Sequence, residues 1–203
     1  MLARSSNHRT RRLIPVMPYG VHMETPEKNM VNAGIIFMFT AWLQGQMSDL
    51  IIFKNNPNLI SDFVKNPTRV PPEFYSIRVS YWEKQFGSVK NEFKEAFSDI
   101  LADDEKRDVE ELYHLRNMIA HAHVSVGRDY MLYRPFGGER REQKLIDDLQ
   151  LQPIDDQSAP MVLKIELWRE DSFKHANDLI ERLEQVTLRK VADSIGVPHS
   201  RIR

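Results

Sequence analysis

The sequence contains no cysteine among its 203 residues. This absence excludes disulfide bonds and thiolate metal sites, and it is compatible with a reducing cytosol. A dominant charge is also missing, since 28 Lys and Arg residues against 29 Asp and Glu residues leave a net charge of −1. An anionic ligand must therefore be held by a local cluster rather than by a global field. We expect an ordinary globular protein of the cytoplasm.

Long apolar runs are lacking as well. The longest covers residues 33–43, is interrupted by Thr40 and is followed at once by polar residues, so it predicts a core helix rather than a membrane span. The N-terminus carries several arginines but no apolar stretch like that of a secretory signal. We interpret residues 1–20 as a flexible basic arm, which either touches RNA or is a disordered tail, and residues 21–203 as one domain.

Helical periodicity dominates the first part of that domain. A helix is predicted over residues 27–54, with Pro26 in its first turn and Thr25 as its N-cap. Its core stripe consists of Ile36, Thr40, Leu43, Met47, Leu50 and Ile51. A second stripe consists of Met38, Trp42, Gly45 and Asp49. A helix that is apolar on two faces is either deeply buried or shared with a partner chain.

Four further helices are predicted, over residues 58–65, 72–101, 103–122 and 172–194. The second of these has Gly87 as a possible bend and a buried stripe of Trp82, Phe86, Val89, Phe93, Phe97 and Ile100. The third has a core face of Leu112, Leu115, Ile119 and Ala122. The last ends before Gly196 and Pro198, the expected order at a helix C-terminus.

Between the last two helices the hydrophobic period changes from that of a helix to that of a strand. A small hairpin is predicted over residues 124–133 and a strand over 163–167. Residues 137–160 are interpreted as an exposed loop, helical in part over 139–149. The predicted fold class is all-α, an up-and-down bundle of about four long helices with a small antiparallel β-hairpin or sheet inserted at about 124–168.

The most informative stretch runs from Arg116 to His121, Arg-Asn-Met-Ile-Ala-His. It places a permanent cation, an amide and an imidazole on one helix. Arginine holds phosphate through a planar fork, and histidine moves protons near neutral pH. With Leu112 at the centre of the core face, Arg116 lies on the shoulder of that face, while Asn117 and His121 lie on the opposite side. A twofold dimer could bring two such sets into one cleft.

A purely structural reading of the same stretch stays open, because short motifs occur by chance. Arg116 would then be a surface ion-pair partner of Glu110 or Glu111. His121 would be a cation favoured by the helix macrodipole. No Gly-rich phosphate loop, Ser-His-Asp pattern or paired-carboxylate motif offers another site.

The Arg-Asn-Met-Ile-Ala-His stretch, preceded by Tyr-His-Leu, resembles the Arg-Asn-x-x-x-His signature of the HEPN superfamily (higher eukaryotes and prokaryotes nucleotide-binding). The helix order over about residues 26–194 agrees with that resemblance, whereas the hairpin and the 137–160 loop lie outside the minimal bundle. The resemblance implies a helical bundle with the motif on an internal helix. It also implies that Arg116 holds the scissile phosphate, that His121 acts as general base or acid, and that Asn117 orients His121 or the phosphate.

The resemblance implies a function as well. Many members of the superfamily are metal-independent endoribonucleases of toxin–antitoxin or phage-defence systems. We expect a homodimeric enzyme that uses the ribose 2′-OH of RNA to form a 2′,3′-cyclic phosphate. It needs no cofactor, no metal and no membrane, and an antitoxin or regulatory protein is a possible partner. The alternative is an inactive HEPN module that binds a nucleotide, RNA or a protein, and a third interpretation is a helical scaffold without a site.

Residues around the motif are candidates for binding substrate. These are His114, His123, Arg128, Tyr130 and Arg134, with Arg140, Arg141, Tyr133 and Phe136 nearby. The arginines can guide an RNA backbone and the aromatic rings can stack on bases. The alternative is a hairpin packed on the bundle with solvated charges. The His-x-His pair of His121 and His123 is a weak metal candidate, because no carboxylate lies at a ligand spacing beside it.

Overall fold

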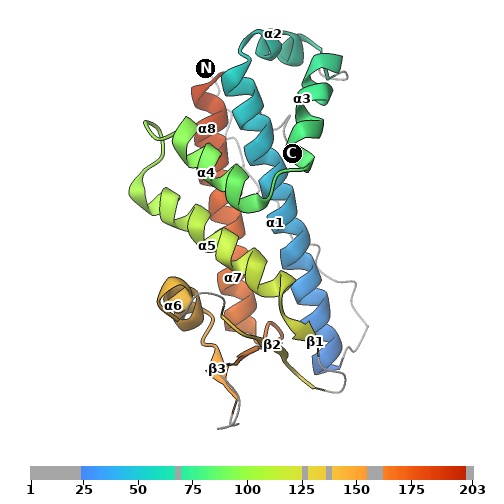
Figure 1. Ribbon diagram of the computed structural model, residues 1–203, viewed down its shortest axis with the longest axis vertical. Helices are drawn as coiled ribbons and strands as arrows, with labels where there is room; N and C mark the ends of the chain where they lie inside the picture. The colour runs from blue at the N-terminus through green and yellow to red at the C-terminus, as the bar shows by residue number, and fades with distance from the viewer. Residues whose placement is uncertain (1–23, 67–69, 125–127, 136–138, 155–161, 200–203) are drawn as a thin grey trace, which may run out of the picture.

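The computed structural model of the chain describes residues 24–66, 70–124, 128–135, 139–154 and 162–199, with the backbone alone for 139–142 and 144. The predicted basic arm lies outside these residues, as do residues 125–127 of the predicted hairpin. Helices make up most of the described chain, and a small antiparallel sheet follows α5 (Figure 1). The predicted combination of helices and a small β insertion is confirmed. The helices are α1 Thr25–Asn55, α2 Asn58–Lys65, α3 Pro72–Trp82, α4 Phe86–Ala96, α5 Asp103–Ala120, α6 Glu139–Asp148, α7 Glu170–Arg182 and α8 Arg189–Ser194.

Helix α1 is the longest element, and α3, α4, α5 and α7 all contact it. All six residues of its predicted core stripe are buried, as the helical period requires. Its N-cap is Glu24 rather than the predicted Thr25, and the Glu27 carboxylate accepts a hydrogen bond from the Glu24 N–H at 3.3 Å. By length and composition α1 could cross a membrane. Of its most apolar 18-residue window, 56% is buried inside the protein.

The single helix predicted over 72–101 is wrong, because the chain breaks at residues 83–85 into α3 and α4. Glu92 of α4 binds the end of α3 and the connection after it, accepting hydrogen bonds from the Tyr81 hydroxyl at 2.5 Å and the Lys84 ammonium at 2.6 Å. The break turns Trp82 out of the predicted buried stripe, and its side chain is 70% exposed. Gly87 does not bend a helix; it lies at the start of α4, where a Cβ would meet the Tyr113 ring at 3.4 Å.

The second apolar stripe of α1 has two different environments. Met38 is 66% exposed, so the stripe is not buried along its whole length. Asp49 is buried and forms an ion pair with Arg78 of α3, with 2.9 Å between Oδ1 and Nε. Burial raises the pKa of Asp49 to about 6, although the Arg78 charge acts to lower it.

The raised pKa of Asp49 predicts a pH-dependent stability. The folded protein retains the Asp49 proton up to about pH 6, whereas the unfolded chain releases it near pH 4, so stability falls as the pH rises between these values. Relative to wild type, we expect the free energy of unfolding of Asp49→Asn to rise by about 2 kcal/mol between pH 4 and pH 7. Urea denaturation at both pH values measures this difference. A difference that does not change with pH would contradict the assignment.

The sheet has the strand order β1-β2-β4-β3, with every pair antiparallel. Its strands are β1 His123–Val124, β2 Met131–Tyr133, β3 Gln152–Pro153 and β4 Leu163–Ile165. The residues of β2 and β4 that face the helices are buried, namely Met131, Tyr133, Leu163 and Ile165. Two buried amides of α1 fix the sheet: Asn29 donates to the Ile165 carbonyl at 3.1 Å and Asn32 to the Leu167 carbonyl at 2.7 Å. The predicted 137–160 loop thus contains α6 and β3.

The predicted last helix is present but not uniform. Helix α7 continues into the π-helical segment η1 Leu183–Leu188 and then α8, a widening that the sequence did not reveal. Gly196, with φ +75°, follows the end of α8 as predicted. On α5, Asp103 and Asp104 are already helical and Ala102 is the N-cap. The predicted core residues Ile119 and Ala122 are only half-buried, whereas Met118 is fully buried.

Candidate functional site

The motif Arg116–His121 occupies the C-terminal end of α5. Arg116 is half-buried, and its guanidinium carbon lies 5.5 Å from the centre of the Phe37 ring of α1. Its Nη1 donates a hydrogen bond to the Asn117 side-chain oxygen at 3.2 Å. The amide thus orients the arginine, whereas the sequence predicted that it orients His121 or the phosphate. Held by a ring and an amide, the guanidinium has a preferred direction.

The acidic partners considered for Arg116 bind other groups. Glu110 accepts hydrogen bonds from Lys90 at 2.5 Å and from Lys94, both on α4. Burial acts to raise the pKa of Glu110, but these two lysines outweigh it and hold the pKa below its usual value. Glu111 contacts His175 instead. Arg116 has no carboxylate partner in the part of the chain that the structure describes. No ion pair joins Arg116 to Glu110 or Glu111 among the described residues.

His121 is the C-cap of α5, and its side chain is exposed. Its backbone N–H donates to the Asn117 carbonyl at 3.0 Å, which closes the last turn of the helix. Asn117 is half-buried on the same outer side. His114, also half-buried, packs edge-on against the Tyr113 ring, with 5.3 Å between the ring centres. Arg116, Asn117 and His121 thus lie together at one helix end, and the two polar side chains of the outer face remain accessible.

The solvent face of the sheet gathers most of the predicted substrate-binding residues. His123 of β1 and Lys164 of β4 both align with Leu132 of β2, so their side chains share one face. The Tyr130 hydroxyl accepts a hydrogen bond from Arg128 at 2.7 Å, and the Lys164 ammonium lies 5.2 Å from the Tyr130 ring centre. The sequence missed Lys164, because only strand pairing brings it to this face.

The other predicted basic residues are less organised. Arg134 is exposed just beyond β2. The structure describes only the backbone at 140 and 141, and Phe136 lies outside the described residues. Tyr133 is buried and so is not available to stack on a base. The candidate nucleic-acid face is therefore made by Arg128, Tyr130, Lys164 and His123, next to the end of α5.

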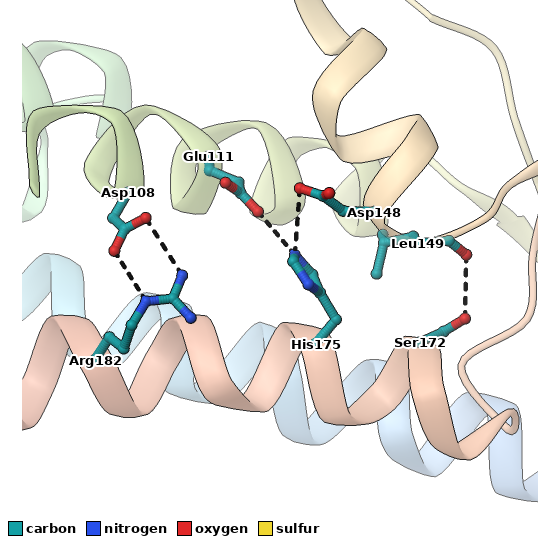
Figure 2. A network of polar contacts seen from close by, with 7 residues as sticks. All are labelled: Asp108, Glu111, Asp148, Leu149, Ser172, His175 and Arg182. Carbon is teal, nitrogen blue, oxygen red and sulfur yellow. Dashed lines mark hydrogen bonds and ion pairs between the residues drawn. The ribbon is translucent and has the colours of Figure 1, made fainter. Parts of the chain in front are cut away.

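A second polar cluster, which the sequence did not predict, lies where α5, α6 and α7 meet (Figure 2). Glu111 of α5 and Asp148 of α6 both point at the Nε2 atom of His175 on α7, at 2.9 Å and 3.7 Å. Glu111 is almost fully buried, and the other two side chains are about one-quarter to one-third exposed. No spacing signal marks this cluster, since Glu111 and His175 are 64 residues apart.

Comparisons with known proteins do not identify this chain. No family model matches its sequence, and no match is found among curated proteins or among solved structures.

Proposed function

We propose that the protein is an endoribonuclease of the HEPN type and that Arg116, Asn117 and His121 form its active site. The observation that carries the proposal is the state of Arg116: a half-buried guanidinium, held by Asn117 and Phe37, with no carboxylate partner in the described chain. A positioned cation without an acidic partner is a site for an anion. The exposed His121 at the end of the same helix supplies a proton-transfer group.

The proposed reaction is an intramolecular transesterification. The ribose 2′-OH loses its proton to one imidazole, and its oxygen forms a bond to the adjacent phosphorus. The bond from phosphorus to the 5′ oxygen breaks, and the oxygen keeps the electron pair of that bond. A second imidazole donates a proton to this oxygen. Arg116 stabilises the charge that develops on the non-bridging oxygens. The products are a 2′,3′-cyclic phosphate and a 5′-hydroxyl end, and DNA is not a substrate because it lacks the attacking hydroxyl.

A second copy of the chain is part of this proposal, because the reaction uses two proton-transfer groups. The outer side of α5 at Asn117 and His121 is accessible, so a twofold mate could bring a second His121 to the same phosphate. The up-and-down bundle order of the long helices, the cytoplasmic location and a toxin or defence role belong to the same proposal. The outer face of the sheet would then guide the RNA toward the paired helix ends.

The first test is RNA cleavage in excess EDTA. We expect the wild-type protein to cut single-stranded RNA and leave 2′,3′-cyclic phosphate ends, while the corresponding DNA stays intact. Arg116→Ala should lower the rate by about 10²–10³, the usual effect of losing one group that stabilises developing charge. Arg116→Lys keeps the charge but loses the planar fork, and it should recover only a minor part of the rate. Intact RNA with a folded wild-type protein would overturn the proposal and favour a module that binds without cleaving.

A further inference from the structure

We propose that Glu111, Asp148 and His175 bind one divalent metal ion of the zinc type, in a site separate from the proposed nuclease site. The three ligand atoms all lie within 4.8 Å of one another. They come from three helices, so only the folded chain forms the site (Figure 2). Imidazole and carboxylate donors are the oxygen and nitrogen ligands that zinc accepts, and three protein ligands leave a fourth position for water.

The distances favour a metal site over a simple hydrogen-bonded histidine. A tetrahedral zinc ion with ligands at 2.0–2.2 Å requires neighbouring donor atoms about 3.4 Å apart. The two distances from His175 Nε2, 2.9 Å to Glu111 and 3.7 Å to Asp148, lie on either side of that value. The 2.9 Å from Nε2 to Glu111 is a hydrogen-bond distance, whereas the 3.7 Å from Nε2 to Asp148 exceeds it. A metal ion at this position would contact all three donors.

The charges of the cluster also favour a metal ion. Two carboxylates converge on the imidazole, and their negative charge would attract a divalent cation. Among the described residues, the charge of Arg182 reaches Glu111, and its guanidinium is bound by Asp108, at 3.1 Å and 3.3 Å (Figure 2). The side chains of Asp148 and His175 are 30% and 27% exposed, so an ion and a water molecule can reach the cluster.

Contacts on both sides hold the ligands in place. The Asp108–Arg182 pair joins α5 to α7 on one side, and the Ser172 hydroxyl donates to the Leu149 carbonyl at 3.1 Å on the other. Such outer contacts limit how far metal ligands must move on binding. Glu111 lies about 140° around α5 from Arg116, on a different side of the helix. The ion would therefore hold α6 against α5 and α7, and it would take no part in the proposed cleavage.

The test uses the full chain, stripped of metal and titrated with Zn²⁺ without RNA. We expect one ion per chain by native mass spectrometry, and a visible absorption band of a four-coordinate site with Co²⁺. Asp148→Asn and His175→Gln should weaken binding by at least about 10–100-fold. Asp178→Asn, which removes another acid of α7 that pairs with Lys174, should bind as wild type does.

A second readout follows α6 itself. Zn²⁺ should slow proteolysis within residues 139–154 in wild type and in Asp178→Asn, but not in Asp148→Asn. Asp148 is partly exposed, so its variant is expected to fold even if His175→Gln does not. Binding of less than one ion per chain, or equal affinity in Asp148→Asn and Asp178→Asn, would overturn the site. Neither result bears on the proposed nuclease, which is tested in EDTA.

Discussion

Replacement of His121 by Ala is expected to lower the rate of RNA cleavage by about 10²–10⁴, the range for loss of a general acid or base. The effect should exceed that of every other substitution proposed for the site, because a paired site loses the base and the acid together. His121 is an exposed C-cap whose side chain makes no part of the buried core, so the variant should keep its fold. Rates measured in EDTA with a fluorescent RNA, together with melting temperatures, give both quantities.

His123 provides the matched control for this experiment. It lies two residues further on, is equally exposed, and belongs to the sheet face proposed to bind RNA. His123→Ala should therefore change mainly KM, whereas His121→Ala should change kcat, and this division separates substrate binding from chemistry. Equal losses of kcat in the two variants would count against His121 as the proton-transfer group. His121→Asn, which retains a polar side chain at the C-cap, should be as inactive as His121→Ala.

Mixed dimers test whether two chains build one site. If the site takes one His121 from each chain, wild-type protein mixed with an excess of His121→Ala protein should lose cleavage activity per wild-type chain, because the mixed dimer holds a single imidazole. If each chain acts by itself, the activity per wild-type chain stays unchanged. In cells, the same His121→Ala substitution should abolish the growth arrest that a toxin of this type would cause.

The sequence predicted the elements whose hydrophobic pattern is strong and local. The core stripe of α1 and the bounds of α2 are confirmed, because a helix of known period buries one face. The break between α3 and α4 was missed, because the stripe from Trp82 to Phe97 continues the helical period across it. A local hydrophobic pattern shows which residues share a helix face only where the helix is unbroken.

The candidate sites divide in the same way. The motif residues were found because they are consecutive on one helix. The Arg116–Phe37 contact, Lys164 beside Tyr130 and the Glu111–Asp148–His175 cluster were not found. Each of these joins segments far apart in the chain, and only the packing of α1, the pairing of β4 and the docking of α6 bring them together. The buried amides Asn29 and Asn32 also lacked a signal, because their partners are backbone carbonyls of a distant strand.

The largest effect on stability is expected from Phe53→Ala. Phe53 of α1 is fully buried, and its ring centre lies 4.7 Å from that of Phe63 in α2 and 4.8 Å from that of Phe74 in α3. The three rings join three helices around one point, so truncation leaves a cavity that none of the helices can fill alone. We expect the free energy of unfolding to fall by about 3–5 kcal/mol. This is a large part of the total for a typical domain, and it should lower the melting temperature by roughly 6–20 °C.

Trp82→Ala is the matched control for Phe53→Ala. It also removes an aromatic ring, from the far end of α3, but the Trp82 side chain is 70% exposed, so the free energy of unfolding should change by no more than about 0.5 kcal/mol. Phe53→Leu, which retains most of the buried volume, should fall between the two. Urea denaturation monitored by circular dichroism measures all three variants. If Trp82→Ala proved as destabilising as Phe53→Ala, Trp82 would be buried as in the continuous 72–101 helix, and the break at residues 83–85 would be wrong.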